Sequence, residues 1–506
     1  MLRKMSACAA ALTLAWGATS SLAQAQAQTD GVLVKLRAES SVKVLSNADH
    51  ARSLSAATKK TLQVSNGPAP DVRLVRGDGT VSDEELAAAL QEADNVEYAA
   101  PNRIMQLQAV PNDPLFGQQW YLQSDVYGAI RAQGAWDITT GSPAAPVAVV
   151  DSGVCAAHPD LAPNLLPGYD FVNNAAGSAG ADCGVDSHGT MVSGLIAAAG
   201  NNSQGIAGLN WDGRIVPVRA LGTGGTGTMA DIIAGIRWAA GMPVTGVANN
   251  PNPVKVINAS LGTVFGQTGI GTCRVIPNSP NSSPAWAELA SDLVSTGVIL
   301  VASAGNDSQP VSEPANCPGA IAVAAVTDDG YKTTYSSFGP EVFISAPGGV
   351  GCVSSSSSCG GMLTTSGSNG YAYAEDRVAG TSFAAPLVSG TIALMLSANS
   401  TLTADDVKAI LKETARPFPY DPSLPLCSGT YSQKCNCTTD TCGVGILDAE
   451  AAVRRAYDFG PSQPHPQPQP DPQYEEESSG GGGAADWLAL FGLLGLAAGK
   501  RRLRKA

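Results

Sequence analysis

Short apolar runs alternate with helical patterns through the long middle part of the chain. The apolar runs predict buried strands at 147–151, 214–221, 254–260, 298–306 and 320–326. Between these runs, apolar residues recur with helical spacing at 191–199, 229–240 and 282–297, and Ser283 followed by Pro284 is typical of a helix start. Strands of this kind, alternating with helices, predict an α/β fold with a doubly wound parallel sheet. Ligands bind at the carboxyl ends of the strands in such sheets.

The preceding segment, residues 28–109, has a different pattern. Strand-like runs at 31–37, 72–77 and 96–108 accompany a helical pattern at 82–93. Ser82 and Glu85 have the spacing of a capping box at the start of that helix. The pattern predicts a small, separate α+β domain, and no residue in it suggests catalysis.

Both ends of the chain differ from the part between them. Residues 1–27 combine a basic start, an apolar stretch and Ala-x-Ala spacing, which predicts a signal peptide and a secreted protein. Residues 459–484 are rich in Pro and Gly and predict an extended linker. The tail, 485–506, has an uncharged run at 487–499 followed by a basic end, and that run is shorter than the roughly 17–25 residues of a stable membrane span.

Composition narrows the function classes. The chain has 506 residues, of which 44% are hydrophobic and 14% charged, so it can build a large core. Asp and Glu number 43 against 30 Lys and Arg, which gives a formal charge of −13. This balance argues against a nucleic-acid partner, because phosphate binding depends on Lys and Arg. Cys8 falls within the signal peptide, and the other cysteines are expected to form disulfides in an oxidising compartment.

Ser382 lies in "GTSFAAP", directly before an apolar run with helical spacing. A serine at this place is a common N-cap, and it is also where a helix start can present free N–H groups and its positive dipole to an anion. Gly380 permits the close approach of a substrate backbone. We expect Pro386 in the first turn, where its missing N–H costs no hydrogen bond. The local sequence leaves both interpretations of Ser382, cap and nucleophile, open.

The histidines limit which residue could activate such a serine. A serine nucleophile needs a base, which is nearly always His at neutral pH. Of the four histidines, only His158 and His188 lie in the large domain, and the loop position of His158 before a proline suggests a structural role. Asp151 and Asn306 each end an apolar run and could orient a histidine and bind an oxyanion. Taken singly, each of these residues also fits a turn or a cap.

The motifs taken together resemble those of subtilisin-like serine peptidases, the subtilase family. They are "VAVVDSGV…HPDL", "SHGTMVSGLIAA", "INASLG", "VASAGN" and "GTSFAAPLVSG", in the family's order across about 110–458. The resemblance implies a subtilisin-like catalytic domain that hydrolyses protein or peptide substrates through an acyl-enzyme. It also implies the site residues: a triad of Asp151, His188 and Ser382, the oxyanion residue Asn306, and the substrate-binding residues Ser260, Leu261 and Gly262.

The resemblance extends to the processing of the chain. It implies that 28–109 is an inhibitory propeptide and that the enzyme is an autoprocessed zymogen. "AVPNDPLFGQQWYL" resembles a mature start, which predicts cleavage near Gln108 to Val110. The tail resembles a GlyGly-type sorting signal, which implies transient membrane insertion and rhombosortase as a processing partner. A permanent anchor is the alternative interpretation of the same tail.

Further features follow from the same resemblance. Asp160 and Asn202 match calcium ligands of many relatives, although one extra residue separates His188 from the Asn202 loop. Local disulfides are expected near the site, and the proposed pairs are Cys155–Cys183, Cys273–Cys317 and Cys352–Cys359. The pairing of Cys427, Cys435, Cys437 and Cys442 is left open.

Two other functions fit the sequence less well, and the substrate preference has two interpretations. A binding protein on an inactive peptidase fold would lack a catalytic residue, and none is missing. A serine-carboxyl peptidase would have Glu in place of His, which "SHGT" contradicts. By resemblance Asp307, Ser312 and Glu313 lie near the specificity pocket, and their acidity would favour a basic residue before the scissile bond. An apolar or broad preference is the alternative.

Overall fold

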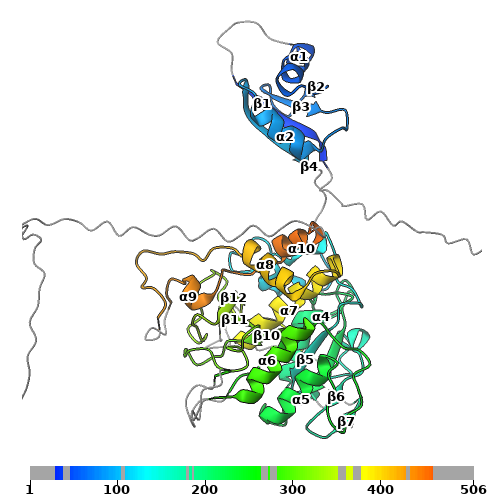
Figure 1. The fold of residues 1–506 in the computed structure, drawn as a ribbon, viewed down its shortest axis with the longest axis vertical. Coiled ribbons are helices and arrows are strands. Elements are labelled where there is room, and N and C mark those ends of the chain that lie inside the picture. The colour runs from blue at the N-terminus through cyan, green and yellow to red at the C-terminus, as the bar shows by residue number, and fades with distance from the viewer. Residues whose placement is uncertain are drawn as a thin grey trace, which may run out of the picture. The chain divides into compact units, whose positions relative to one another are not determined.

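The computed structural model describes residues 29–37, 46–103, 109–177, 182–184, 187–263, 272–273, 282–350, 360–367, 378–428 and 434–459 (Figure 1). The expected signal peptide, the linker beyond Phe459 and the sorting tail lie outside these residues, as do Cys352 and Cys359.

The N-terminal unit is a four-stranded antiparallel sheet with two helices. The strand order is β2-β3-β1-β4, and β3 and β4 both pair with β1. The elements are β1 (Thr29–Leu36), α1 (Asn47–Thr58), β2 (Gln63–Asn66), β3 (Val72–Arg76), α2 (Asp83–Gln91) and β4 (Val96–Arg103). Ser82 and Glu85 form the predicted capping box at α2. The sequence pattern missed α1 and β2, and α1 buries only Leu54, so it has no apolar stripe.

One hydrophobic core holds this unit together. Val32 and Val34 of β1 point to the same side of the strand and pack with Leu54 of α1 and Leu86 of α2. Both helices therefore cover the same face of the sheet. Pro101 lies in β4, the edge strand, where its lack of an N–H group is tolerated.

The large unit is built on an eight-stranded sheet of order β12-β11-β10-β9-β5-β8-β6-β7. All neighbouring strands are parallel except β6 and β7. All five predicted strands are present, and the prediction of a mostly parallel α/β fold is confirmed. The strands are β5 (Val147–Asp151), β6 (Tyr169–Asp170), β7 (Ala175–Ala176), β8 (Ile215–Arg219), β9 (Val256–Ala259), β10 (Ile299–Ser303), β11 (Ile321–Val326) and β12 (Val342–Pro347).

Helices cover both faces of this sheet. Figure 1 shows α5 and α6 (green) beside each other in front of β5. The helices are α3 (Ala132–Trp136), α4 (His188–Ala197), α5 (Met229–Ala239), α6 (Pro284–Thr296), α7 (Thr381–Ala398), α8 (Ala404–Thr414), α9 (Thr439–Cys442) and α10 (Ala449–Tyr457). Short 3₁₀ turns lie at Phe116–Gln118, Trp120–Leu122 and Ala162–Asn164.

Two cores form because alternate residues of each strand point to opposite faces. Val147 and Val149 of β5 pack in the core that contains α4, α7, α8 and α10. Ala148 and Val150 pack in the core that contains α5 and α6. The strand is therefore buried on both faces, which is why its sequence is a continuous apolar run.

Helix α7 is long and apolar enough to span a membrane by length and composition alone. Of its residues, 83% are buried within the fold, so in this structure it is a core helix of the large unit. Among the described residues it is the one helix with these properties.

Candidate active site

Asp151 and His188 meet at the carboxyl end of β5. Asp151 is the last residue of the strand and is fully buried, and His188 is the first residue of α4. The Nδ1 atom of His188 lies 2.9 Å and 3.0 Å from the two carboxyl oxygens of Asp151. About a third of the histidine side chain is exposed, so the pair has one buried and one accessible member.

The two segments approach each other closely because α4 begins with glycine after the histidine. A Cβ atom at Gly189 would lie 2.1 Å from the carbonyl oxygen of Gly153, so no larger residue fits without moving the Asp151 loop. Ser152 completes this contact, since its hydroxyl accepts the N–H of Gly189 at 3.0 Å.

A second carboxyl group, Asp182, lies behind this pair and was not predicted from the sequence. It is buried, and its Oδ2 accepts the N–H of Thr190 at 2.8 Å and the Thr190 hydroxyl at 2.7 Å. Burial raises the pKa of Asp182 to about 6, although the hydrogen bonds from Thr190 and Ser152 lower it in part. The signal in the sequence was weak, because the residue stands in an irregular segment between two motifs.

Both carboxyl groups act on the protonation of His188. Burial lowers the pKa of His188, but the charge and hydrogen bond of Asp151, with a further contribution from the charge of Asp182, outweigh it. The net effect is a raised pKa for the imidazole. The imidazolium form is thus stabilised at this position, as a proton acceptor requires.

Ser382 lies at the start of α7, but it is not the cap. The N-cap residue is Gly380 and the helix begins at Thr381, so of the two interpretations left open for Ser382 the structure excludes the cap. As the second helical residue, Ser382 keeps a backbone N–H without an acceptor inside the helix. This placement leaves both its hydroxyl and its N–H available to a ligand.

The expected position of Pro386 is also wrong, and the correction explains a contact. Pro386 is inside α7, beyond the first turn, where it removes the N–H that would bond to the carbonyl of Ser382. The hydroxyl of Ser260 supplies the missing donor at 2.8 Å from that carbonyl oxygen. The side chain of Ser382 in turn donates to the carbonyl of Ser260 at 3.4 Å.

Asn306 lies next to the start of α7. Its Oδ1 accepts the N–H and the hydroxyl of Thr381, both at 2.9 Å. Because these bonds fix the amide oxygen, the Nδ2 donor points away from Thr381, and a Cβ atom at Gly380 would lie 3.4 Å from it. Asn306 and the N–H of Ser382 are therefore two donors at the same helix end.

A cavity of about 510 Å³ opens beside these residues. His188, Ser260, Leu261 and Gly262 all line it, as the resemblance implied. Of the three residues expected near a specificity pocket, only Glu313 is among the lining residues. Asp307 is exposed and Ser312 is buried, and neither is among the lining residues.

The matches to known proteins agree with this geometry. A model of the Subtilase family matches residues 143–455. The chain belongs to the subtilase family. It is 37% identical over 414 residues to an extracellular protease of Xanthomonas campestris pv. campestris, covering 76% of this chain and 64% of the relative. It is 33% identical over 306 residues to thermitase of Thermoactinomyces vulgaris, covering 60% of this chain and 91% of thermitase.

A solved structure supports the same fold. A protease of Pseudoalteromonas arctica PAMC 21717 superposes with a TM-score of 0.56 at 36% identity, covering 69% of this subtilase and 100% of that chain. This subtilase spans 64% of the length of the Xanthomonas protease and 58% of the extracellular basic protease of Dichelobacter nodosus.

The two residues expected to bind calcium in this subtilase do lie together, but they bond to each other. Asn202 donates its Nδ2 to Asp160 at 2.8 Å, and Ile206 donates its N–H to the other carboxyl oxygen at 3.1 Å. The Oδ1 of Asn202 accepts the N–H of Gln204, which fixes the orientation of the amide. In this arrangement the amide nitrogen of Asn202, and not its oxygen, faces Asp160, so a calcium ion shared by the two residues would require the amide to turn over.

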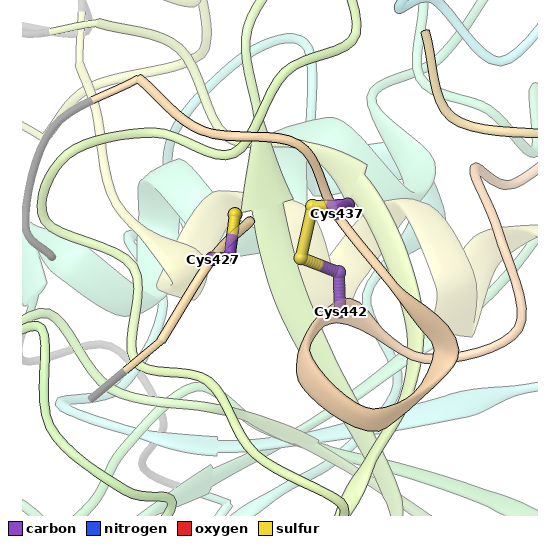
Figure 2. A group of neighbouring side chains, drawn as sticks. All are labelled: Cys427, Cys437 and Cys442. Atoms are coloured by element: carbon purple, nitrogen blue, oxygen red, sulfur yellow. A yellow bond between two sulfur atoms is a disulfide. The ribbon is translucent and has the colours of Figure 1, made fainter. Parts of the chain in front are cut away.

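The described cysteines of this subtilase are paired. Cys155 bonds to Cys183 and Cys273 bonds to Cys317, the two pairs that the sequence analysis proposed and that lie within the described residues. Near the C-terminus the pairs are Cys427–Cys435 and Cys437–Cys442. Figure 2 shows the second of these bonds with Cys427 beside it. Although Cys427, Cys437 and Cys442 have sulfur atoms within 4.8 Å of one another, their disulfides leave no thiolate for a metal.

Two other predictions concern His158 and Ser283. His158 is fully buried and accepts the N–H of Asp160, which is consistent with the structural role expected for it. Ser283 does precede Pro284 at the start of α6, but its hydroxyl makes no capping bond. It donates instead to Glu313 at 3.0 Å.

Proposed function

We propose that this subtilase is a secreted serine endopeptidase that acts through Asp151, His188 and Ser382. The observation that carries the proposal is the hydrogen-bonded Asp151–His188 pair, with His188 lining the same cavity as Ser260, whose carbonyl bonds to the hydroxyl of Ser382. The relatives support it, since those reported above are named as proteases.

The reaction begins with proton transfer from Ser382. Its hydroxyl leaves the Ser260 carbonyl and donates to Nε2 of His188 as it attacks the substrate carbonyl carbon. Asp151 holds Nδ1 protonated and stabilises the imidazolium that forms. Hydrogen bonds between a nucleophile and its base often form fully only when substrate binds. The bond of the Ser382 hydroxyl to the Ser260 carbonyl in the free enzyme therefore does not argue against proton transfer to His188.

The oxyanion is bound by two donors. Nδ2 of Asn306 and the N–H of Ser382 meet the negative charge that develops on the carbonyl oxygen, assisted by the dipole of α7. The intermediate then expels the amine, which takes its proton from His188, and leaves an acyl-enzyme on Ser382. Water deprotonated by His188 hydrolyses that ester and restores the free enzyme.

A fluorophosphonate probe tests the assignment. The processed protein should be labelled at one serine, and Ser382→Ala should abolish both labelling and peptide hydrolysis. His188→Ala should do the same, because the serine then has no base. Labelling of the Ser382→Ala protein, or no labelling of the processed wild type, would reject the triad.

The chain organisation belongs to the same proposal. Residues 1–27 direct secretion, 28–109 inhibit the enzyme until they are cut off, 110–458 form the catalytic domain, 459–484 form a linker and 485–506 a sorting tail. In the secreted wild type, N-terminal sequencing should find a start near Gln108 to Val110. The Ser382→Ala protein should keep residues 28–109, and an identical start in both proteins would reject autoprocessing.

The tail is proposed to be removed by rhombosortase. Its glycines, short apolar run and basic end support this over a permanent anchor. In a host with rhombosortase, the mature protein should end before the apolar run at 487–499. Intact-mass measurement of the released protein checks this, and retention of the whole tail would support the anchor instead.

A structural calcium ion at Asp160 and Asn202 is supported by the resemblance and opposed by the hydrogen bonds of this structure. Binding requires the Asn202 amide to present its oxygen in place of its nitrogen. If calcium binds here, added calcium should raise the melting temperature of wild type and not that of Asp160→Asn. Equal melting temperatures with calcium and with a chelator would remove calcium from the proposal.

The proposed function also includes three disulfides near the active site. Cys155–Cys183, Cys273–Cys317 and the pair Cys352–Cys359, which lies outside the described residues, are proposed to hold the loops around the site. Peptide mapping without reduction tests all three, and a fragment joining Cys352 to any other cysteine would reject the last pair.

A further inference from the structure

Tyr335 connects the two parts of the fold that supply the oxyanion donors. We propose that Tyr335 is a positioning residue, which fixes the loop of Asn306 through its backbone and the start of α7 through its hydroxyl. This inference rests on the proposed function, and it adds a residue outside the motifs that keeps the two donors in register.

The backbone around Tyr335 holds the loop on both sides of Asn306. The N–H of Ser337 donates to the carbonyl of Gly305 at 2.9 Å. The N–H of Ser308 donates to the carbonyl of Tyr335, also at 2.9 Å. The side chain of Asn306 thus extends from a loop that is bonded, before and after it, to one short segment.

The hydroxyl of Tyr335 reaches the start of α7. It donates to the carbonyl oxygens of Gly348 and Gly349, at 2.7 Å and 2.8 Å. The N–H of Gly380, the N-cap residue of α7, donates to the same carbonyl of Gly348 at 2.9 Å. One carbonyl oxygen is therefore shared by Tyr335 and by the residue two positions before Ser382.

This shared contact is tightly packed. A Cβ atom at Gly348 would lie 2.9 Å from the hydroxyl oxygen of Tyr335 and 3.0 Å from the carbonyl oxygen of Gly380. The ring of Tyr335 packs against the core that contains α7. Burial raises the pKa of the Tyr335 phenol, so the hydroxyl stays protonated, as a donor must be, in alkaline solution as well.

A buried cation fixes the segment that contains Tyr335. Lys332 is 2% exposed, and its Nζ donates to the carbonyls of Thr333 at 2.9 Å and Ser336 at 2.8 Å. The ammonium group also lies 5.4 Å from the centre of the Phe338 ring, within the range of a cation–π contact. Because residues on both sides of Tyr335 are bonded to one ammonium group, the backbone of the tyrosine is held in place.

The position of both donors matters for the rate of the reaction. Two donors stabilise an oxyanion fully only when both are aimed at the place where the charge develops. Asn306 comes from the loop after β10 and the N–H of Ser382 comes from α7, so their relative position depends on the contacts between these elements. Loss of the Tyr335 hydroxyl should therefore weaken binding of the transition state and leave binding of the substrate nearly unchanged.

Tyr335→Phe tests the proposal, because it keeps the ring and removes the hydroxyl alone. With a peptide substrate, kcat should fall about three- to tenfold and KM should change little. The Ki of a peptide aldehyde, whose adduct with Ser382 presents an oxyanion to the same donors, should rise by the factor by which kcat/KM falls. Tyr331→Phe removes a phenolic hydroxyl from the same segment, where the ring lies against Lys434, and should leave kcat and Ki as in wild type.

A second background separates positioning from a general structural role. In Asn306→Ala one of the two donors is absent, so Tyr335→Phe should lower kcat by a smaller factor there than in wild type. Fluorophosphonate titration to completion gives the fraction of correctly formed sites in every variant, so misfolding is not mistaken for lost positioning. Active, labelled wild type with an unchanged kcat in Tyr335→Phe, or an equal factor in both backgrounds, would overturn this inference and leave the proposed function intact. Absence of labelling of the wild type would overturn both.

Discussion

Asp182 should influence the pH dependence of the enzyme through His188. The base must be neutral to accept a proton, so kcat/KM falls as the pH drops through the raised pKa of His188. In Asp182→Asn one of the charges that raise this pKa is absent, and the acid limb should move to lower pH. The change should be seen above pH 6, where Asp182 itself is ionised.

The pH profile of kcat/KM, measured on wild type and Asp182→Asn, checks this. Asp212→Asn, which removes an exposed carboxyl group, is the control and should leave the limb in place. A limb that moves to higher pH in Asp182→Asn would contradict the electrostatic role, whereas a uniform loss of activity would indicate a purely structural one.

Asp182 should also affect stability, with a definite sign. Its pKa is raised from 3.8 to about 6 in the folded protein, so the folded state binds more protons between these pH values. The free energy of unfolding therefore decreases as the pH rises from about 4 to about 6, by up to about 3 kcal/mol from this group. Urea unfolding of the inactive Ser382→Ala protein, with and without Asp182→Asn, should show a smaller decrease in the variant, and equal decreases would contradict it.

Thr381 positions the oxyanion donor and is predicted to act on kcat. Its hydroxyl donates to Oδ1 of Asn306 and accepts the N–H of Gly305. Thr381→Val removes both bonds and loosens Asn306, so kcat should fall about tenfold with KM little changed, less than the 10²–10³-fold typical of losing such a donor. Thr391→Val on the same helix is the control, and a rise in KM alone would refute the assignment.

For individual residues, the sequence motifs indicated the candidate triad and Asn306, but they did not indicate residues such as Asp182 that lie in irregular segments. Asp151, His188, Ser382 and Asn306 were proposed because each stands next to one end of a patterned run. Asp182 could not be found, because only the fold brings it to Thr190 and Ser152. The sequence also does not reveal which acidic residue lines the cavity, and the fold places Glu313 there but not Asp307.

Among the elements, α7 contains an interruption that its neighbour repairs. Pro386 leaves the carbonyl of Ser382 without a helical donor, and the hydroxyl of Ser260 replaces it. In the inactive Ser382→Ala protein, Ser260→Ala should lower the free energy of unfolding by about 1 kcal/mol. In the Pro386→Ala background the loss should be smaller, because the substituted alanine would supply an N–H to the same carbonyl.

A double-mutant cycle from urea unfolding measures this coupling. The cycle cancels the effect of proline on the unfolded chain, because that effect is common to both Pro386→Ala proteins. A coupling energy of zero would mean that the Ser260 hydroxyl does not replace the missing helical bond.

The elements were predicted where periodicity is strong. Both the apolar run at β5 and the helix α5 match their patterns, since each has a clear buried surface. Among the elements that were missed are the strands β2 and β12, the helix α1 and the short strands β6 and β7. In α1 a single buried leucine gives no apolar stripe, and β6 and β7 are too short for alternation to be recognised.

Over the whole molecule, the parallel sheet assembles residues that are far apart in the chain. β5 and β9 are neighbours at the centre of the sheet, and their carboxyl ends bring Asp151 and Ser260 to one edge. α4 and α7 pack on the same face and place His188 and Ser382 there. This is where a doubly wound sheet binds its ligands, so the predicted fold class already indicates this edge of the sheet as the place of the candidate site.

The disulfides contribute to the stability of the large unit, and the size of each contribution should follow the length of the loop that it closes. Cross-linking removes more freedom from the unfolded chain when the closed loop is longer. Cys155–Cys183 spans 28 residues and Cys437–Cys442 spans 5. Replacing the first pair by alanines should lower the free energy of unfolding by about 3–4 kcal/mol and replacing the second by about 2 kcal/mol.

The two double-alanine variants should also differ in activity. This difference distinguishes a general loss of stability from a disturbance close to His188. Cys183 is adjacent to Asp182, and the N–H of Cys155 donates to the Thr190 hydroxyl, so breaking their bond should loosen the network behind His188. At a temperature where both proteins remain folded, kcat should fall in Cys155→Ala/Cys183→Ala and stay near wild type in Cys437→Ala/Cys442→Ala. Equal kcat values in the two proteins would mean that the Cys155–Cys183 bond stabilises the fold without positioning the catalytic pair.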